Sequence, residues 1–462
     1  MELAPAAGAA PSPVTNQSLL WQAKVTRAFD VPPRLSDTRF ECGWENGAAN
    51  PICQQPFAQT AVRPSNTGTY QPFLYVLPGA FMRLADSPSA ALRVGRVVSA
   101  LLAGLLLCAA IAMAWSREVG PASLLGVLTA TTPMVIFVAS SLSASGPEVI
   151  AAIAFAAAAL RVARDAERTS VGVWYVLGVS GSVLALGRAL GPLFVVVILL
   201  TVAAFSPATV RRAVQKSRTR VLATAGVLAT ATAAGLGWEL SQQPHATSTF
   251  SSLWAAVRPA IDDLPSVLRQ SIGNFGALDT PLPGFAWQLW LVAFAALVTA
   301  ALAMANRRQR IVLVAVVAMI LIVSIAATVQ QRQTGFGLQG RHVLPLLILL
   351  PLLASEILVR ARPLPRHVVR ALAIGLPVIV AVVQAVGWYT NARYVALGAD
   401  PGWTISGNAR WAPPLGWGFW AVVVASAAAA IGSVGFSSSG PLSREKTPTE
   451  KPGADVSAKP AR

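Results

Sequence analysis

The stretch VVSALLAGLLLCAAIAMAW runs from Val97 to Trp115 without a single charged side chain. An α-helix rises 1.5 Å per residue, so about 20 apolar residues span the ~30 Å hydrocarbon core of a bilayer. The stretch therefore predicts a transmembrane helix. Because backbone polar groups inside lipid must pair within their own segment, a helix is the structure that such a sequence favours.

Further stretches along the chain approach the same length and apolar composition. Together they predict an all-α integral membrane protein, a polytopic bundle of about eleven transmembrane helices. After Val97–Trp115, the predicted spans are Pro121–Leu142, Pro147–Val162, Val171–Gly187, Leu190–Phe205, Val221–Trp238, Phe285–Ala305, Ile311–Val329, Val343–Val359, Ala371–Trp388 and Leu415–Val434.

Composition excludes most soluble classes of protein, since 54% of the residues are hydrophobic and only 12% are charged. The formal net charge of +17 comes from 36 Lys and Arg against 19 Asp and Glu. These basic residues lie in short runs between apolar segments, which is typical of cytoplasmic loops and not of a nucleic-acid-binding domain. We therefore expect the lipid bilayer as a partner and no nucleic acid.

The basic connections set the predicted orientation in a bacterial cell membrane, because cytoplasmic loops carry excess Lys and Arg. If every stretch spans, they all fall on one side together with the tail 435–462, whose composition is typical of a disordered cytoplasmic segment. The transmembrane domain is then 97–434. The residues that define this side are Arg161, Arg164, Arg168, Arg211, Arg212, Lys216, Arg218, Arg220, Arg307, Arg308, Arg310, Arg360, Arg362, Arg366 and Arg370.

An odd number of spans places residues 1–96 on the outer face, with the predicted outer loops 239–284, 330–342 and 389–414. The first residues lack the basic and apolar regions of a signal peptide. We expect a twelfth helix to precede Met1, with translocation of the segment after insertion as the alternative. Cys42 and Cys53 predict a disulfide in this segment; unpaired thiols or half of a metal site are alternatives. The scattered histidines give no metal-ligand spacing, so no metal ligands are predicted.

The excess of basic residues in cytoplasmic loops does not explain arginines on the predicted outer face, so their presence needs another explanation. Arg341 and His342 precede the stretch Val343–Val359, where a helix N-terminus favours anions, and Arg188 lies between two apolar stretches. With Arg332 they are candidates to bind a phosphate group, which guanidinium groups hold through paired hydrogen bonds. The alternative for each arginine is contact with lipid headgroups or with a nearby carboxylate.

Outer carboxylates are few and are candidates for a general base or for holding a divalent cation. Glu148 falls in the first turn of a predicted helix, and Asp279 lies in the long outer loop. Aromatic residues such as Tyr70 and Tyr75 favour an interfacial belt, with sugar stacking as the alternative. No phosphate-binding loop, dinucleotide fingerprint, serine-hydrolase elbow or zinc-protease motif is found, so no nucleotide cofactor is expected.

Several strings in this order resemble the family of bacterial membrane proteins known as domain of unknown function 2142. The resemblance covers about Val25 to Ala429. The strings are Thr69–Tyr75 (TYQPFLY), Ala139–Ser143 (ASSLS) with Gly146–Glu148 (GPE), Gly273–Pro283 (GNFGALDTPLP) and Leu338–Pro345 (LQGRHVLP).

That family is similar to the GT-C class of membrane glycosyltransferases, and the resemblance implies transfer of a sugar from a polyprenyl-phosphate donor to an envelope glycan, lipid or protein. It implies that Arg188 and Arg341 hold the donor phosphate and that Asp279 orients the long loop or the acceptor. Tyr70, Tyr75 and Gln339 are the expected contacts to sugar or acceptor.

The chain departs from the family pattern where members carry an acidic motif after their first helix. Residues Asn16–Leu20 (NQSLL) stand there without an acid. Either Asp30 supplies the base or this copy has lost it. Two other hypotheses are a transporter or flippase for a lipid-linked or anionic solute, and a catalytically inactive partner of an envelope-synthesis complex.

Overall fold

The computed structural model describes residues 24–30, 62–65, 67–166, 169–242, 252–276, 278–334, 337–361, 366–398, 404–405, 409 and 412–437. The elements, in chain order, are β1 (Arg27–Asp30), β2 (Val62–Ser65), η3 (Phe73–Tyr75), α3 (Val76–Met82), α4 (Pro88–Ala114), η4 (Pro121–Leu124), α5 (Leu125–Ala130), α6 (Pro133–Ala139), α7 (Ser145–Arg164), α8 (Val171–Ala185), α9 (Gly191–Phe205), α10 (Pro207–Lys216), α11 (Arg218–Gln242), α12 (Leu253–Gly273), β3 (Asn274–Phe275), β4 (Thr280–Pro281), α13 (Gly284–Met304), α14 (Arg307–Arg332), η5 (Gly340–His342), α15 (Leu344–Leu347), α16 (Leu349–Arg360), α17 (Arg366–Leu397) and α18 (Gly416–Ser437).

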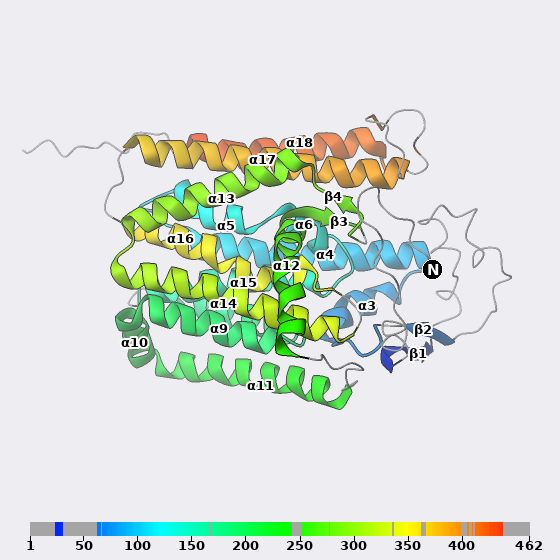
Figure 1. Ribbon diagram of the computed structural model, residues 1–462, viewed down its shortest axis with the longest axis horizontal. Helices are drawn as coiled ribbons and strands as arrows, with labels where there is room; N and C mark the ends of the chain where they lie inside the picture. The colour runs from blue at the N-terminus through cyan, green and yellow to red at the C-terminus, as the bar shows by residue number, and fades with distance from the viewer. Residues whose placement is uncertain are drawn as a thin grey trace, which may run out of the picture.

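The long helices run side by side and form an all-α bundle (Figure 1). Helix α10 lies at one end of the bundle, and the two-stranded sheets β1–β2 and β3–β4 lie with α3 toward the other. Both sheets are antiparallel. The protein is thus a polytopic helical membrane protein, as the apolar stretches predicted.

Helix α7 forms the centre of the bundle. In its apolar window 94% of the residues are buried, and it contacts α4, α6, α8, α9 and α16. Its sequence from Ala151 to Ala159 is mostly alanine, and these small side chains let neighbouring helices approach closely. Glu148, in the first turn of α7, is consequently surrounded by protein.

Helices α4, α11 and α18 form the periphery, with only 22%, 17% and 11% of their apolar windows buried. Their outward side chains are large and apolar, for example Leu105 and Leu222, which are 69% and 72% exposed. Such surfaces face lipid in a membrane protein, because the same area in water would be strongly unfavourable.

The predicted number of spans is not confirmed. Every predicted stretch overlaps a helix, but within the described residues seven helices are long and apolar enough to cross a membrane, or up to nine if each of two bent pairs is one span. The α8 helix has 15 residues and α16 has 12, so at 1.5 Å per residue each falls short of a ~30 Å core. Apolar composition alone could not reveal these interruptions.

The stretch Pro121–Leu142 was predicted as one span, but it is broken between α5 and α6, whose axes differ by 72°. Thr132 is extended because it precedes Pro133, and its hydroxyl caps α6 by accepting from the N–H of Val135 at 3.3 Å. A second break, of 108°, separates α9 from the basic helix α10 at Ser206 and Pro207.

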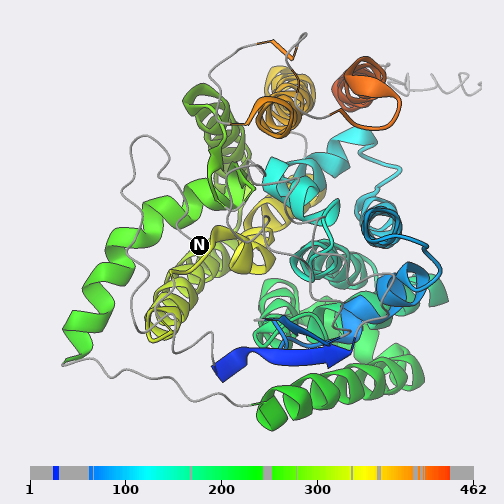
Figure 2. The same ribbon diagram turned by 90° about the vertical axis from the view of Figure 1, so that its right-hand side faces the viewer.

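The segments predicted as outer loops contain helix, and two of them differ most from the prediction. The interval 239–284 includes the end of α11 and all of α12, whose charged residues and two internal prolines, Pro259 and Pro265, conceal it from a search for apolar runs. The interval 389–414 begins inside α17, which extends to Leu397. Helix α12 crosses the direction of the spanning helices (Figures 1 and 2).

Candidate functional site

Glu148 lies in the first turn of α7 and is 1% exposed. The chain can enter α7 here because Gly146 lies against α6, where an added Cβ would come within 2.3 Å of the Val138 carbonyl oxygen. A carboxylate at this position is favoured by the positive end of the helix. Gly187 packs over the side chain, since a Cβ there would lie 3.1 Å from Glu148 Cβ and Cγ.

Arg188 follows in the turn between α8 and α9. Its Nε lies 3.9 Å from Glu148 Oε2, and its Cζ lies 5.6 Å from the centre of the Tyr70 ring. The turn is tight because Gly191 packs against the end of α8, where an added Cβ would meet the Leu184 carbonyl oxygen at 2.1 Å. The turn therefore holds an arginine between a buried carboxylate and an aromatic ring.

Arg341 and His342 reach the same place from η5. Gly340 makes this approach possible, because a Cβ there would lie 2.4 Å from both Ser271 N and Val267 O of α12. The Gly340 N–H donates to Gln270 Oε1 at 3.0 Å. The Gln-Gly-Arg string thus encodes a segment fixed against α12.

The charges around this segment are coupled. Burial, and then the positive charge of Arg188, lower the pKa of Arg341, while Tyr70 and Tyr75 act in the opposite direction. Burial also holds the pKa of His342 well below its ordinary value, with Arg188 and Arg341 adding to the effect. His342 is consequently neutral at pH 7, and the two arginines repel each other in a partly dehydrated environment.

The string Thr69–Tyr75 supplies the aromatic side of the site. The Trp238 indole N–H donates to the Thr69 carbonyl oxygen at 3.1 Å, which ties the string to α11. At the other end the Tyr75 hydroxyl oxygen accepts from the Ala144 N–H at 3.1 Å, next to the start of α7. We call Tyr70, Tyr75, Glu148, Arg188, Arg341 and His342 the arginine cluster.

Among the buried side-chain polar atoms without a hydrogen-bond partner in the described part of the chain, five lie in or beside this cluster. These five are Ser145 Oγ, Glu148 Oε2, Arg188 Nε, Gln339 Oε1 and Arg341 Nε. A buried polar atom left unpaired costs about 1–3 kcal/mol, so several of them in one region are typical of a binding site. The set contains both donors and acceptors, which suits a ligand with phosphate oxygens and hydroxyl groups.

Residues 19–350 match the family described as "Predicted membrane protein (DUF2142)". The chain belongs to this family. Neither the curated proteins nor the solved structures searched contain a significant match. The strings of the sequence thus indicated the correct family, although the match to DUF2142 ends at residue 350, whereas the resemblance was expected to extend to Ala429.

The DUF2142 match includes every residue of the arginine cluster. Two other predicted site residues, Asp279 and Arg332, lie outside this cluster. Asp279 is in the β3–β4 hairpin, where its Oδ2 accepts from the Tyr394 hydroxyl at 2.6 Å and its Oδ1 accepts from Thr280 Oγ1 at 3.2 Å. These bonds fix the hairpin against α17, and the loop-orienting or acceptor-orienting role of Asp279 stays a prediction. Arg332 pairs with Asp263 of α12, with Nη2 2.8 Å from Oδ2.

Other predicted residues cannot be placed at the site. Asp30 ends β1, where its backbone is opposite Val62 of β2, and its side chain is outside the described part of the structure. Cys42 and Cys53 also lie outside the described residues, so their disulfide stays a prediction. Among the described residues no group of three His, Cys, Asp or Glu side chains could hold a metal ion.

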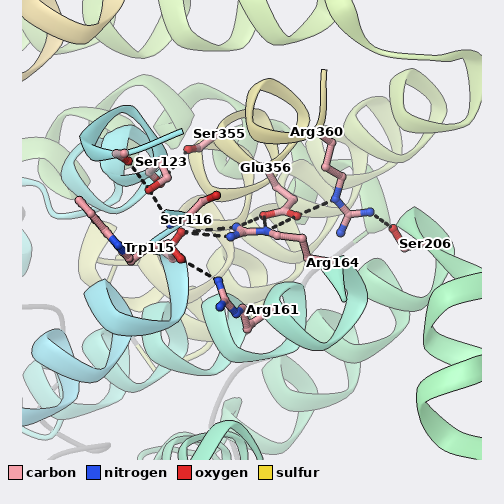
Figure 3. A network of polar contacts seen from close by, with 11 residues as sticks. Trp115, Ser116, Ser123, Arg161, Arg164, Ser206, Ser355, Glu356 and Arg360 are labelled. Carbon is pink, nitrogen blue, oxygen red and sulfur yellow. Dashed lines mark hydrogen bonds and ion pairs between the residues drawn. The ribbon is translucent and has the colours of Figure 1, made fainter. Parts of the chain in front are cut away.

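A second buried charge, Glu356, was not singled out by the sequence, and it lies just beyond the DUF2142 match. It is 2% exposed on α16 and accepts from Arg164 Nε of α7 at 3.0 Å and from Arg360 Nε at 2.6 Å (Figure 3). Arg360 also donates to Ser206 at the α9–α10 break. The signal in the sequence was an acid four residues before an arginine within an apolar stretch. The hydrogen bonds to this carboxylate come from two arginines of the protein itself. The network therefore joins α7, α9 and α16.

Proposed function

We propose that this protein is a GT-C-like glycosyltransferase that transfers a sugar from a polyprenyl-phosphate donor to an envelope glycan or lipid acceptor. The observation that supports it is the convergence of two partly buried arginines, one buried carboxylate and two tyrosines from separate parts of the chain. On the predicted topology this cluster lies on the outer face of the bacterial cell membrane, with the C-terminus in the cytoplasm.

Arg188 and Arg341 are the proposed ligands of the donor phosphate. Their mutual repulsion is an electrostatic cost that an anion between them would remove, because each guanidinium can donate to phosphate oxygens. The neutral His342 beside them can donate one further hydrogen bond. Arg332 was also predicted to bind the phosphate. Because it pairs with Asp263 of α12, we propose only an indirect role for it.

Glu148 is the carboxylate best placed for proton transfer. In the proposed reaction an acceptor hydroxyl oxygen attacks the anomeric carbon of the sugar while the bond from that carbon to the phosphate oxygen breaks. The polyprenyl phosphate leaves with the electron pair, and the hydroxyl proton passes to a carboxylate. Asp30 remains the other candidate for this base, whereas Asp279 is engaged by Tyr394.

The tyrosines and Gln339 are the proposed contacts to the sugar or acceptor. Tyr70 already lies under a guanidinium, and Tyr75 has its hydroxyl at the start of α7. Gln339 has a buried amide oxygen without a partner in the described part of the chain, which can accept from a sugar hydroxyl. No nucleotide is required by this scheme, and a divalent cation would act through the phosphate oxygens.

A flippase for a lipid-linked anion is the second candidate, and the broken α5–α6 segment favours it. Interrupted helices line substrate paths in many transporters. Here the break is held by Gln384 Nε2, which donates to Thr131 O at 2.6 Å, and by Thr132 Oγ1, which donates to Ser271 O at 2.8 Å. A catalytically inactive partner of a synthesis complex is the third candidate, suggested by the absence of an acidic residue in Asn16–Leu20.

The test uses the full-length chain in liposomes with a radiolabelled polyprenyl-phosphate sugar and an envelope extract as acceptor. Transfer of label to the acceptor by the wild-type chain, with loss in Arg341→Ala but not in Arg308→Ala, supports the transferase. Arg308 is exposed in the first turn of α14 and serves as a matched control. Movement of intact donor between leaflets without label transfer would instead identify a flippase.

A further inference from the structure

Helix α12 has three distinct faces. Its buried face consists of Ala256, Ala260, Val267 and Ser271, which are at most 4% exposed. Residues seven positions apart lie on one side of a helix, because each residue turns it by about 100°. The other residues of α12 can be assigned to faces on this basis.

An apolar stripe on α12 faces away from the protein. Trp254, Ile261 and Leu268 are seven residues apart and are 64%, 41% and 40% exposed. Next to this stripe lies a polar one, in which Arg258, Asp262 and Ser266 are exposed. An apolar and a polar stripe side by side, both uncovered, are typical of a helix that lies in a membrane interface.

The position of α12 in the fold agrees with an interfacial location. It runs across the direction of the spanning helices (Figures 1 and 2). Its Asp263 binds Arg332, the last residue of the membrane-spanning candidate α14, at 2.8 Å. Near its C-terminal end Gln270 accepts from the N–H of Gly340, next to the arginine cluster. The helix therefore lies where a spanning helix ends.

We infer that α12 is an interfacial helix whose Trp254, Ile261 and Leu268 insert among phospholipid acyl chains of the leaflet on the side of the arginine cluster, with Arg258 and Asp262 at the headgroups. A cation on the polar edge fits the phosphates of that surface. Because Gln270 and the close packing of Gly340 attach the Gln339–His342 segment to α12, the lipid surface sets the depth of the arginine cluster. This inference is independent of the reaction proposed above.

Photo-crosslinking tests the inference in the full-length chain. The photoreactive residue p-benzoylphenylalanine replaces Ile261, Leu268 or Ser266 in vesicles of phosphatidylethanolamine and phosphatidylglycerol, and adducts are identified by mass spectrometry. Replacement of Leu105, which is 69% exposed on the spanning helix α4, is the positive control. We expect phospholipid adducts at Ile261 and Leu268, and several-fold fewer at Ser266.

Three outcomes would overturn the inference while Leu105 reacts with lipid. They are no lipid adduct at Ile261 and Leu268, adducts to a second copy or another protein at these positions, and equal lipid adducts on both stripes. A nitroxide label at the same positions provides a second measurement. The apolar stripe should be accessible to oxygen and the polar stripe to a water-soluble nickel complex, and the reverse order would contradict the assignment.

Discussion

Arg188 Nε and Glu148 Oε2 lie 3.9 Å apart, and neither atom has a hydrogen-bond partner in the described part of the chain. The separation is within reach of an ion pair but too long for a direct hydrogen bond. Glu148 is 1% exposed, and Arg188 is the positive charge that lies next to its carboxylate. A second arginine, Arg341, adds positive charge to the same region, and this is the basis of the phosphate site proposed above.

Glu148→Gln should strengthen phosphate binding and weaken sugar transfer. The amide keeps the shape of the side chain but removes a negative charge from beside the proposed phosphate, and this should tighten binding of polyprenyl phosphate by about tenfold, or ~1.4 kcal/mol. The transfer rate should fall because the amide cannot accept the proton. Intrinsic fluorescence titration with polyprenyl phosphate measures the first effect; weaker binding by the variant would contradict this account of the cluster.

Gly340→Ala should destabilise the packing of η5 on α12. The added methyl group would lie 2.4 Å from two backbone atoms, which cannot move without displacing the helix, and the expected cost is roughly 2–3 kcal/mol. Gly337→Ala is the matched control, since nothing lies within 4 Å of a Cβ there. Thermal unfolding in detergent, followed by circular dichroism, should separate the two variants; equal melting temperatures would refute the close approach.

Glu356→Ala should be among the most damaging single changes at the opposite end of α7. It would leave Arg164 and Arg360 partly buried without their carboxylate, and breaking a buried ion pair typically costs about 3–5 kcal/mol. Glu118→Ala removes an exposed acid and should change stability by less than about 0.5 kcal/mol. Denaturation by sodium dodecyl sulfate compares them, and a Glu356→Ala protein as stable as the wild type would show that the network is dispensable.

Acidification should weaken the fold through His342. Burial and the nearby arginines hold its folded-state pKa below the unfolded value of about 6.5, so the unfolded chain binds the proton more readily. The stability linked to this residue is complete above pH 6.5 and decreases as the pH falls below it. His342→Gln should lose less stability over this range; parallel pH profiles for the two proteins would exclude the effect.

Particular residues show how far the sequence could predict this structure. The strings containing Tyr70, Glu148 and Arg341 were correctly predicted to belong to one family, and they meet in the fold although long segments separate them. Arg188 was singled out because arginines on the predicted outer face are not explained by topology. In the structure it lies 3.9 Å from the buried Glu148, and its role in phosphate binding stays a prediction.

What the sequence did not predict depends on contacts between distant segments. Helix α12 contains charged residues and two prolines and is attached to other segments through Asp263–Arg332 and Gln270–Gly340, so a search for apolar runs missed it. The break at Thr132 follows from Pro133 and from partners on α12 and α17 that no local pattern reveals. The string Gly273–Pro283 led to the prediction that Asp279 lies at the site. Its partner Tyr394 could not be predicted because it follows Asp279 by more than a hundred residues.

A structure of the protein in lipid nanodiscs with added polyprenyl phosphate would test the central claim most directly. We predict that the phosphate lies within hydrogen-bonding distance of the guanidinium groups of Arg188 and Arg341, with its chain leaving between helices toward lipid. A phosphate held at another surface of the bundle, with the arginine cluster unchanged from the arrangement described above, would contradict the account.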